Sequence, residues 1–336
     1  MTSGAAESAD LEAEWARALK ILAGAQQICL ACHVRPDADA LGSMLAVAHA
    51  IQAAGHRGAV IASFGDDPFE VPGNLRFLPG CELLSHPAQY PARPQVMVTF
   101  DAASADRLGI LAPSAARADE LIVFDHHASN AGFGSVRLVD PAAPATAVLA
   151  RELIARLGTA LSRDIATGLY AGLLTDTGSF RFSTTPQVHL LAAELIGTGI
   201  DPGVVARELF DRAPFGYLGL LSAVLGRAAL EPQAAAGLGL VWTAVSRADR
   251  DRAAVPLDVV EPVIDVLRRT DEAEVAVVLK EADNGDWLVS TRSKGQVDVG
   301  QACQALGGGG HPRAAGFTAG GTAAEVMAAL RERLGR

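Results

Sequence analysis

The chain has 336 residues, of which 50% are hydrophobic, and this is enough to fill the cores of one large or two ordinary domains. Its 28 basic and 38 acidic side chains give a formal net charge of −10. This charge disfavours a long nucleic acid as partner, because phosphate backbones are held mainly by Lys and Arg. The four cysteines are scattered, so no disulfide framework is expected.

The first segment, MTSGAAESADLEAEWARALK, is acidic and lacks the basic start and continuous apolar run of a signal peptide. Apolar stretches further along are interrupted by charges or, like ALGSMLAVAHAIQAAG, are too short to cross a membrane. We therefore expect a cytoplasmic protein with no membrane partner.

Short apolar runs alternate with Ala- and Leu-rich helical patterns through the first part of the chain. The apolar runs are QQICLACH, GAVIASFG, PQVMVTFD, ELIVFDHH and SVRLVD. Buried strands separated by helices predict an α/β domain with a doubly wound, mainly parallel sheet, and we place this domain at residues 1–205.

The pattern is helical from about Ser162 to Gly226, with breaks at STTP, GTGIDP and RAPFG, and residues 206–226 are predicted to form a helical connector. Strand patterns then return as GLGLVWTAV, EVAVVLKEA and DWLVSTRS, with helices between them and a last helix in AAEVMAALRERLG. This predicts a smaller α/β domain at residues 227–336.

Two signals conflict at the end of the first predicted strand. Cys29, Cys32 and His33 form C-x-x-C-H, which is typical of haem attachment or of thiol redox chemistry. The same histidine begins H-x-x-x-D-x-D with Asp37 and Asp39, which is typical of a metal site. Residues three apart on a strand point to opposite faces, so the two cysteines could not both reach one haem. We favour the metal site and expect both cysteines to be small buried residues.

Further acids and histidines follow other predicted elements. Asp101 ends PQVMVTFD, and Asp125, His126 and His127 end ELIVFDHH, so all reach the carboxyl edge of the sheet, where ligands bind in α/β folds. Asp176 ends an apolar helix and could close the site from the side. Alone, each Asp is more often a helix cap or turn residue. Together these groups would repel or desolvate one another without cations, which predicts a dinuclear metal site.

Four segments, HVRPDADALGS, FDAAS, FDHHASN and LLTDTGSF, resemble in order the four motifs of the DHH phosphoesterases. The stretch RSKGQVDVGQACQALGGGGHPRAAGF resembles the signature of the DHH-associated C-terminal domain. The length and layout are most similar to the bacterial oligoribonuclease (nanoRNase) and 3′-phosphoadenosine-5′-phosphate phosphatase branch. RecJ-like nucleases are usually larger, and family II inorganic pyrophosphatases have a different C-terminal domain without the GGGGH run.

The resemblance implies two divalent metal ions, with Asp101 shared between them. The first ion would be held by His33, Asp37 and Asp101, and the second by Asp39, Asp101, His126 and Asp176. Two such ions can stabilise both the attacking and the leaving oxygen at a phosphorus atom. Mixed imidazole and carboxylate ligands suit manganese, with magnesium or cobalt as substitutes.

The resemblance also implies that Asp125 orients a ligand histidine and that His127 contacts the phosphate, where it could neutralise charge or protonate the leaving oxygen. Two interpretations stay open for Arg107, a phosphate contact or an ion pair. Phe180 and Phe182 could stack on a base, but core packing is favoured for each.

The four glycines Gly307 to Gly310 could be a flexible turn, or they could let backbone N–H groups approach a phosphate. By resemblance, this run belongs to a pocket for the terminal phosphate of the substrate. The substrate-binding residues would be Arg292, Ser293, Gly308, Gly309, Gly310 and His311. The role of Arg313 stays open.

The implied activity is hydrolysis of short RNA, that is oligoribonucleotides or linear dinucleotides, to mononucleotides, and of the nucleoside bisphosphate 3′-phosphoadenosine 5′-phosphate to AMP. The preferred substrate and the cleavage of cyclic dinucleotides stay open, and a homodimer is implied by the resemblance alone. The alternatives are an inorganic pyrophosphatase and a non-catalytic nucleotide sensor. A sensor would be expected to have lost a ligand carboxylate.

Overall fold

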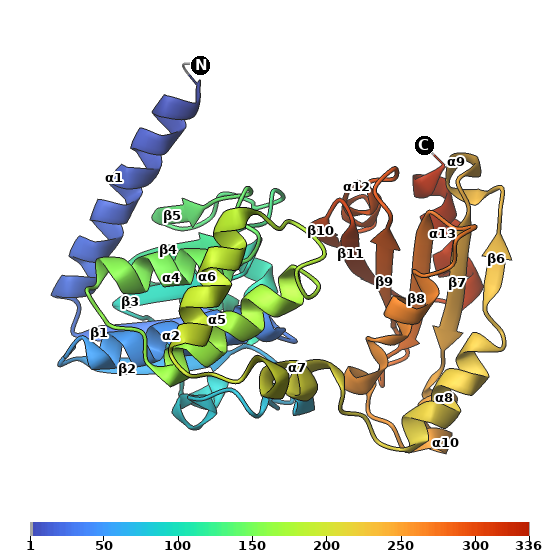
Figure 1. The fold of residues 1–336 in the computed structure, drawn as a ribbon, viewed down its shortest axis with the longest axis horizontal. Helices are drawn as coiled ribbons and strands as arrows, with labels where there is room; N and C mark the ends of the chain where they lie inside the picture. The colour runs from blue at the N-terminus through green and yellow to red at the C-terminus, as the bar shows by residue number, and fades with distance from the viewer. Residues whose placement is uncertain (1–2, 336) are drawn as a thin grey trace. The chain divides into compact units, whose positions relative to one another are not determined.

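The computed structural model describes residues 3–335, so residues 1–2 and 336 of the predicted domain ranges lie outside the described residues. It divides into two compact units, Met1–Arg212 and Ala213–Arg336 (Figure 1). The division falls inside the predicted connector of residues 206–226.

The first unit is built on a five-stranded sheet whose strands are all parallel, in the order β2-β1-β3-β4-β5. The strands are β1 Gln27–Cys32, β2 Ala59–Phe64, β3 Val96–Phe100, β4 Glu120–Asp125 and β5 Val136–Val139. Every residue of β3 is buried, as expected for a strand covered on both faces. The predicted doubly wound, parallel α/β fold is confirmed.

Helices cover one face of this sheet, and shorter segments cover the other. The helices of the unit are α1 Ser3–Gly24, α2 Ala38–Ala53, α3 Ala112–Ala115, α4 Thr146–Arg156, α5 Arg163–Asp176, α6 Pro186–Gly197 and α7 Pro202–Phe210. The 3-10 segments are η1 Gly73–Leu75, η2 Cys81–Leu83, η3 Pro87–Gln89 and η4 Ala105–Leu111. Buried side chains of α1, α2, α4 and α5 form the larger core, whereas η4 and α3 pack on the opposite face.

The two cysteines of β1 confirm the alternation expected of a strand. Cys29 and Cys32 are both completely buried, and they lie in the cores on opposite faces of the sheet. Burial raises the pKa of the Cys29 thiol to about 12. The prediction of two buried cysteines is therefore confirmed, and a shared haem is excluded.

Helices α2 and α5 cross at a pair of glycines. A Cβ at Gly42 would lie 2.4 Å from the carbonyl oxygen of Gly168, and a Cβ at Gly168 would lie 2.6 Å from the carbonyl oxygen of Gly42. Only glycine permits this approach of two backbones. The contact matters for the site because α2 carries Asp39 and α5 ends in Asp176.

The second unit contains a six-stranded mixed sheet in the order β10-β11-β9-β8-β7-β6, in which only the β7–β8 pair is parallel. Its strands are β6 Ala229–Glu231, β7 Leu240–Val245, β8 Val275–Glu281, β9 Trp287–Ser293, β10 Gly309–His311 and β11 Ala314–Ala319. Its helices are α8 Gly216–Leu225, α9 Ala234–Gly237, α10 Arg247–Ala253, α11 Val263–Leu267, α12 Val299–Gln304 and α13 Ala323–Leu334, with the 3-10 segment η5 Leu257–Val260. Helices α12 and α13 pack on one face, and α8 and α11 pack on the other.

The glycine run differs from the flexible turn that its composition allows. Its second half enters β10, which pairs with β11. A Cβ at Gly308 would lie 2.1 Å from the carbonyl oxygen of Gly316, so the close approach to β11 requires glycine there.

No single helix in residues 3–335 is long and apolar enough to cross a membrane. Helices α6 and α7 are long and apolar enough only when they are taken together, and the chain bends by 107° between them.

Candidate active site

The loop between β1 and α2 supplies the first polar groups. Asp37 is the N-cap of α2, and its Oδ1 accepts hydrogen bonds from the backbone N–H groups of Asp39 and Ala40, each at 3.0 Å. Its second oxygen, Oδ2, lies 3.9 Å from Nε2 of His33. The two carboxylates of the D-A-D sequence therefore have different roles. Asp37 caps helix α2, and Asp39 points into the protein interior.

Asp39 is completely buried and faces the N-terminus of α4. Its carboxylate accepts the backbone N–H of Thr146 at 2.6 Å and that of Ala147 at 2.8 Å. These donors and the helix dipole favour the negative charge. Burial and the nearby carboxylates of Asp176 and Asp101 act more strongly and hold the pKa of Asp39 well above its usual value.

Asp101 lies between two histidines. Its Oδ2 is 3.4 Å from Nε2 of His33, and its Oδ1 is 3.4 Å from Nε2 of His126. The residue follows β3 directly and has a φ of +59°, a left-handed conformation that the short side chain of Asp tolerates. Burial would raise the pKa of Asp101, but the hydrogen bond with His33 and the charges of the imidazoles lower it.

His126 approaches three carboxylates with one nitrogen. Its Nδ1 lies 3.1 Å from the carbonyl oxygen of Ala143, which can only accept, so this nitrogen carries the proton. Its Nε2 lies 3.1 Å from Asp176, 3.4 Å from Asp101 and 3.9 Å from Asp39. Although burial opposes it, the hydrogen bond with Asp176 raises the pKa of His126 to about 11. Burial raises the pKa of Asp176 to about 6.

These groups fit divalent metal ions. Among the groups whose ligand atoms lie within 4.8 Å of one another, two overlap at Asp101 and consist of predicted ligands, namely His33, Asp37 and Asp101, and Asp39, Asp101 and His126. Ligand atoms bound at about 2.1 Å to one ion in octahedral geometry are about 3 Å apart. The nitrogen–oxygen distances of 3.1–3.9 Å around His33 and His126 are close to that spacing. Carboxylates that share a buried space at raised pKa are also stabilised when a cation replaces their protons.

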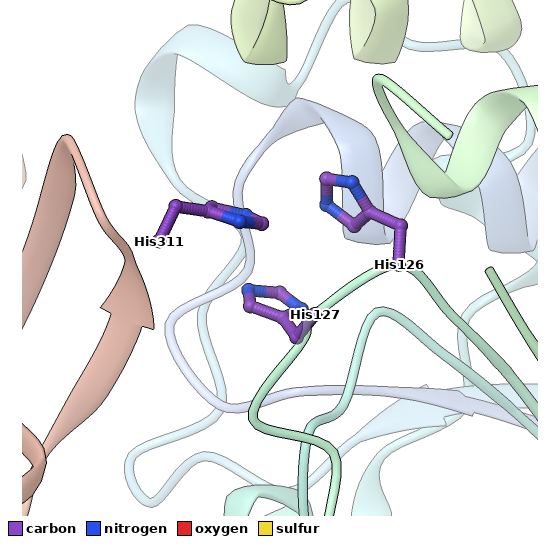
Figure 2. A group of neighbouring side chains, drawn as sticks. All are labelled: His126, His127 and His311. Carbon is purple, nitrogen blue, oxygen red and sulfur yellow. The ribbon is translucent and has the colours of Figure 1, made fainter. Parts of the chain in front are cut away.

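Asp125 holds a different histidine from the one expected. We predicted that it orients a metal-ligand histidine, but its Oδ1 lies 2.7 Å from Nδ1 of His127, which is not in the predicted ligand set. Its other oxygen accepts the side-chain amide of Asn130 at 2.6 Å. Figure 2 shows the neighbouring imidazoles of His126 and His127, whose ring planes meet at 68° with centroids 5.0 Å apart. Asp125 therefore fixes the proton of His127 on Nδ1.

Thr146 is a site residue that the sequence analysis missed. Its hydroxyl donates to Oδ1 of Asp101 at 2.8 Å, and both side chains are buried. A Thr at the first turn after AAPA is a helix-start signal, but that signal does not reveal which carboxylate the residue meets.

The structure gives the surroundings of three side chains for which the sequence left two roles open, Arg107, Phe180 and Phe182. Nη2 of Arg107 is 3.4 Å from Nδ1 of His33. Phe180 packs against the larger core of the first unit, with its ring centroid 6.2 Å from that of Tyr170. The guanidinium of Arg181 lies 5.5 Å from the ring centroid of Phe182. Core packing is thus borne out for Phe180.

In the second unit, part of the predicted substrate-binding set shares one face of the sheet. Arg292 pairs with Ala314, which pairs with His311, and Gly309 pairs with Gly316. Directly paired residues of antiparallel strands project from the same face. Arg292, Gly309 and His311 therefore lie on one face, above a surface of Gly and Ala.

Ser293 does not join them. Adjacent residues of a strand point to opposite faces, and Ser293 is buried, with its hydroxyl donating to Oε1 of Glu274 at 2.8 Å. The same oxygen accepts the backbone N–H groups of Gly295 and Gln296, each at 2.7 Å. Ser293 and Glu274 thus order the loop after β9. Arg313 is exposed, and its side chain lies over Gly295.

Comparison with known proteins matches residues 27–173 to the DHH family, N-terminal domain, and residues 243–335 to the DHHA1 domain. The bifunctional oligoribonuclease and PAP phosphatase NrnA of Thermus thermophilus is 35% identical over 328 residues, which cover 96% of this chain and 94% of the relative. The protein of the same name from Bacillus subtilis is 25% identical and is matched over 88% of its length by 86% of this chain. An exopolyphosphatase-related protein from Bacteroides fragilis has the same fold, with a TM-score of 0.83 and 22% identity over 96% of both chains.

Proposed function

Because the chain belongs to the DHH family, we propose that it is a phosphoesterase that hydrolyses short oligoribonucleotides and linear dinucleotides to mononucleotides, and 3′-phosphoadenosine 5′-phosphate to AMP. The observation that carries the proposal is the cluster around Asp101, where imidazole nitrogens and carboxylates have the spacing of metal ligands. The relatives named as oligoribonucleases and PAP phosphatases support the substrate class.

We propose manganese as the native metal, with magnesium or cobalt as substitutes. One ion would be held by His33, Asp37 and Asp101, and the other by Asp39, Asp101, His126 and Asp176. When bound, such ions polarise a phosphoryl oxygen and stabilise charge on the attacking and leaving oxygens. The proton on Nδ1 of His126, held at the Ala143 carbonyl, leaves Nε2 as the nitrogen that would bind a metal.

Besides the metal ions, we propose His127 as the side chain that acts directly on the phosphoryl group. Asp125 accepts the Nδ1 proton of His127, so the Nε2 side of the ring is the one that faces the substrate. Burial alone would lower the pKa of His127, but the hydrogen bond with Asp125 and the charge of Asp101 raise it. In its imidazolium form, His127 can stabilise phosphoryl charge or give a proton to the leaving oxygen.

The second unit would bind the terminal phosphate of the substrate. The proposal is supported by the shared face of Arg292, Gly309 and His311. Ala314 and Gly316 place no large side chain on this face, so a ligand can approach the backbone of the strands closely. Gly308 and Gly310 would serve the pairing of β10 with β11, and Ser293 would support the site through the loop after β9.

The experiment is to incubate the purified protein with manganese and a labelled, 5′-phosphorylated diribonucleotide. Mononucleotide products are expected, and their absence at every metal concentration would overturn the proposal. Asp101→Ala should abolish turnover of every substrate. Arg292→Ala should lower activity on nucleotides about ten- to hundredfold, from a charge-assisted contact of about 1.5–3 kcal/mol. The artificial diester bis-p-nitrophenyl phosphate, which has no terminal phosphate, should be affected much less.

The chain keeps the carboxylates of Asp37, Asp39, Asp101 and Asp176, so no observation favours the alternative of a non-catalytic sensor. Fast release of phosphate from pyrophosphate would support the pyrophosphatase alternative. The predicted cytoplasmic location and the homodimer stay predictions.

A further inference from the structure

The second unit contains a charged cluster that the metal chemistry does not use. Lys280 of β8 donates to Glu261 in a close ion pair and to Oγ of Ser290 at 2.7 Å. Oγ of Ser290 in turn lies 2.9 Å from Oε1 of Glu261. Nη2 of Arg292 lies 3.5 Å from the same Oε1. The four side chains thus form one network that ends at the proposed phosphate-binding arginine.

The network is buried at one end and accessible at the other. Lys280 is 7% exposed, whereas 22% of the Arg292 side chain and 46% of the Glu261 side chain are exposed. Ser290 and Arg292 project from the same face of β9, since they are two residues apart. Glu261 lies between Val260 and Val263, whose side chains are completely buried, so the backbone at Glu261 is anchored in the core.

The charges show why Glu261 orients Arg292 without neutralising it. A buried ammonium group requires a counter-ion, and the closest contacts of Glu261 go to Lys280 and Ser290. The network carries two positive charges and one negative charge, so one positive charge remains for an anion. The guanidinium is further held by the bond from Nη1 of Arg292 to the carbonyl oxygen of Thr291 at 3.0 Å.

We propose that Glu261, held in place by Lys280 and Ser290, is a positioning residue that presents Arg292 to the terminal phosphate of the substrate. This inference rests on the proposed function. A long arginine side chain loses rotamer freedom when it binds a ligand, and a partner that fixes it beforehand removes that cost from binding. The effect of Glu261 should therefore pass through Arg292 and appear in KM.

The test is a double-mutant cycle with Glu261→Gln and Arg292→Ala, using a 5′-phosphorylated diribonucleotide. The glutamine keeps an acceptor for Lys280 and Ser290 but removes the charge. We expect Glu261→Gln to raise KM about tenfold with kcat within about twofold. The double variant should be no worse than Arg292→Ala alone, because residues that act through one contact are not additive.

Three results would overturn the inference. Losses that add in the double variant would show a general structural role for Glu261. An unchanged KM in Glu261→Gln would show no role in binding. A lower KM would show that Glu261 competes with the phosphate for the guanidinium.

A matched control is Asp283→Asn, which removes the carboxylate of a separate ion pair in the same unit, 2.8 Å from Arg250. Its KM should equal that of the wild type. If Glu261→Gln does not fold, the cycle is repeated in a Lys280→Met background, which removes the buried ammonium group. Failure of the wild type to cleave the dinucleotide would overturn the proposed function instead, so the two failures are distinguishable.

Discussion

Thr146→Val should weaken metal binding, although Thr146 is not a proposed ligand. The hydroxyl of Thr146 donates to Oδ1 of Asp101 at 2.8 Å, and its backbone N–H donates to Asp39 at 2.6 Å. Valine keeps the branched shape and the backbone N–H and removes only the hydroxyl. The substitution therefore isolates the bond that orients the carboxylate shared by both proposed ions.

The magnitude follows from burial. Thr146 is 0% exposed and Asp101 is 3% exposed, so bulk water does not replace the lost donor. A hydrogen bond to a charged acceptor contributes about 1.5–3 kcal/mol, and about 1.4 kcal/mol corresponds to a factor of ten in affinity. Loss of a group that orients a metal ligand typically costs about 10- to 100-fold. We therefore expect manganese affinity to fall about 10- to 100-fold.

The assay is calorimetric titration of manganese into metal-free protein, with Thr146→Ser as the control that keeps the hydroxyl. The serine variant should bind more tightly than the valine variant. Equal affinities for the valine variant and the wild type would refute the role of the hydroxyl. Equal losses in both variants would show that the threonine methyl group, and not the bond to Asp101, supports the site.

Three further predictions concern other parts of the chain. Gly309→Ala should keep wild-type stability because its Cβ meets nothing within 4 Å, whereas the Cβ of Gly308→Ala would lie 2.1 Å from a backbone oxygen and should cost about 1–3 kcal/mol in unfolding experiments. Metal binding near neutral pH should release protons, because the hydrogen bond with Asp176 raises the pKa of metal-free His126 to about 11; affinity should fall as the pH is lowered, and more steeply below about pH 6, where a proton on Asp176 also competes with the cation. Titrations in buffers of different ionisation enthalpy and at several pH values measure both effects, and no proton release would contradict the metal role of His126. Native Cys29 should resist thiol reagents at about pH 8, since a pKa of about 12 leaves almost no thiolate, and rapid labelling without unfolding would contradict this.

Much of the first unit was predictable because its signals are local. The apolar runs correspond to the five parallel strands, and parallel strands bring Asp101 and His126 to one edge whatever the details of packing. The roles of Thr146 and Asp125 could not be predicted from such local sequence signals. Thr146 meets Asp39 across 107 residues of sequence, and only the packing of α4 on α2 brings them together. For Asp125, the side-chain directions at the end of β4 decide which of two adjacent histidines it holds.

Ser293 shows a different limit. The family resemblance grouped it with Arg292, yet the alternation of side chains along a strand separates the two. The same rule had correctly separated Cys29 from Cys32 on β1. The glycine run is a third case, because its pairing with β11 depends on a contact that the sequence of β10 alone does not contain.

The contact of Gly42 with Gly168 joins peptide groups directly, so no side chain there can adjust its rotamer to absorb a substitution. The separation of the carboxylates on α2 and α5 is therefore a property of two backbones. An alanine at either glycine would shift one helix along with the acidic residue that it carries. We therefore expect alanine at either position to change turnover, although neither glycine is a proposed ligand or substrate-binding residue.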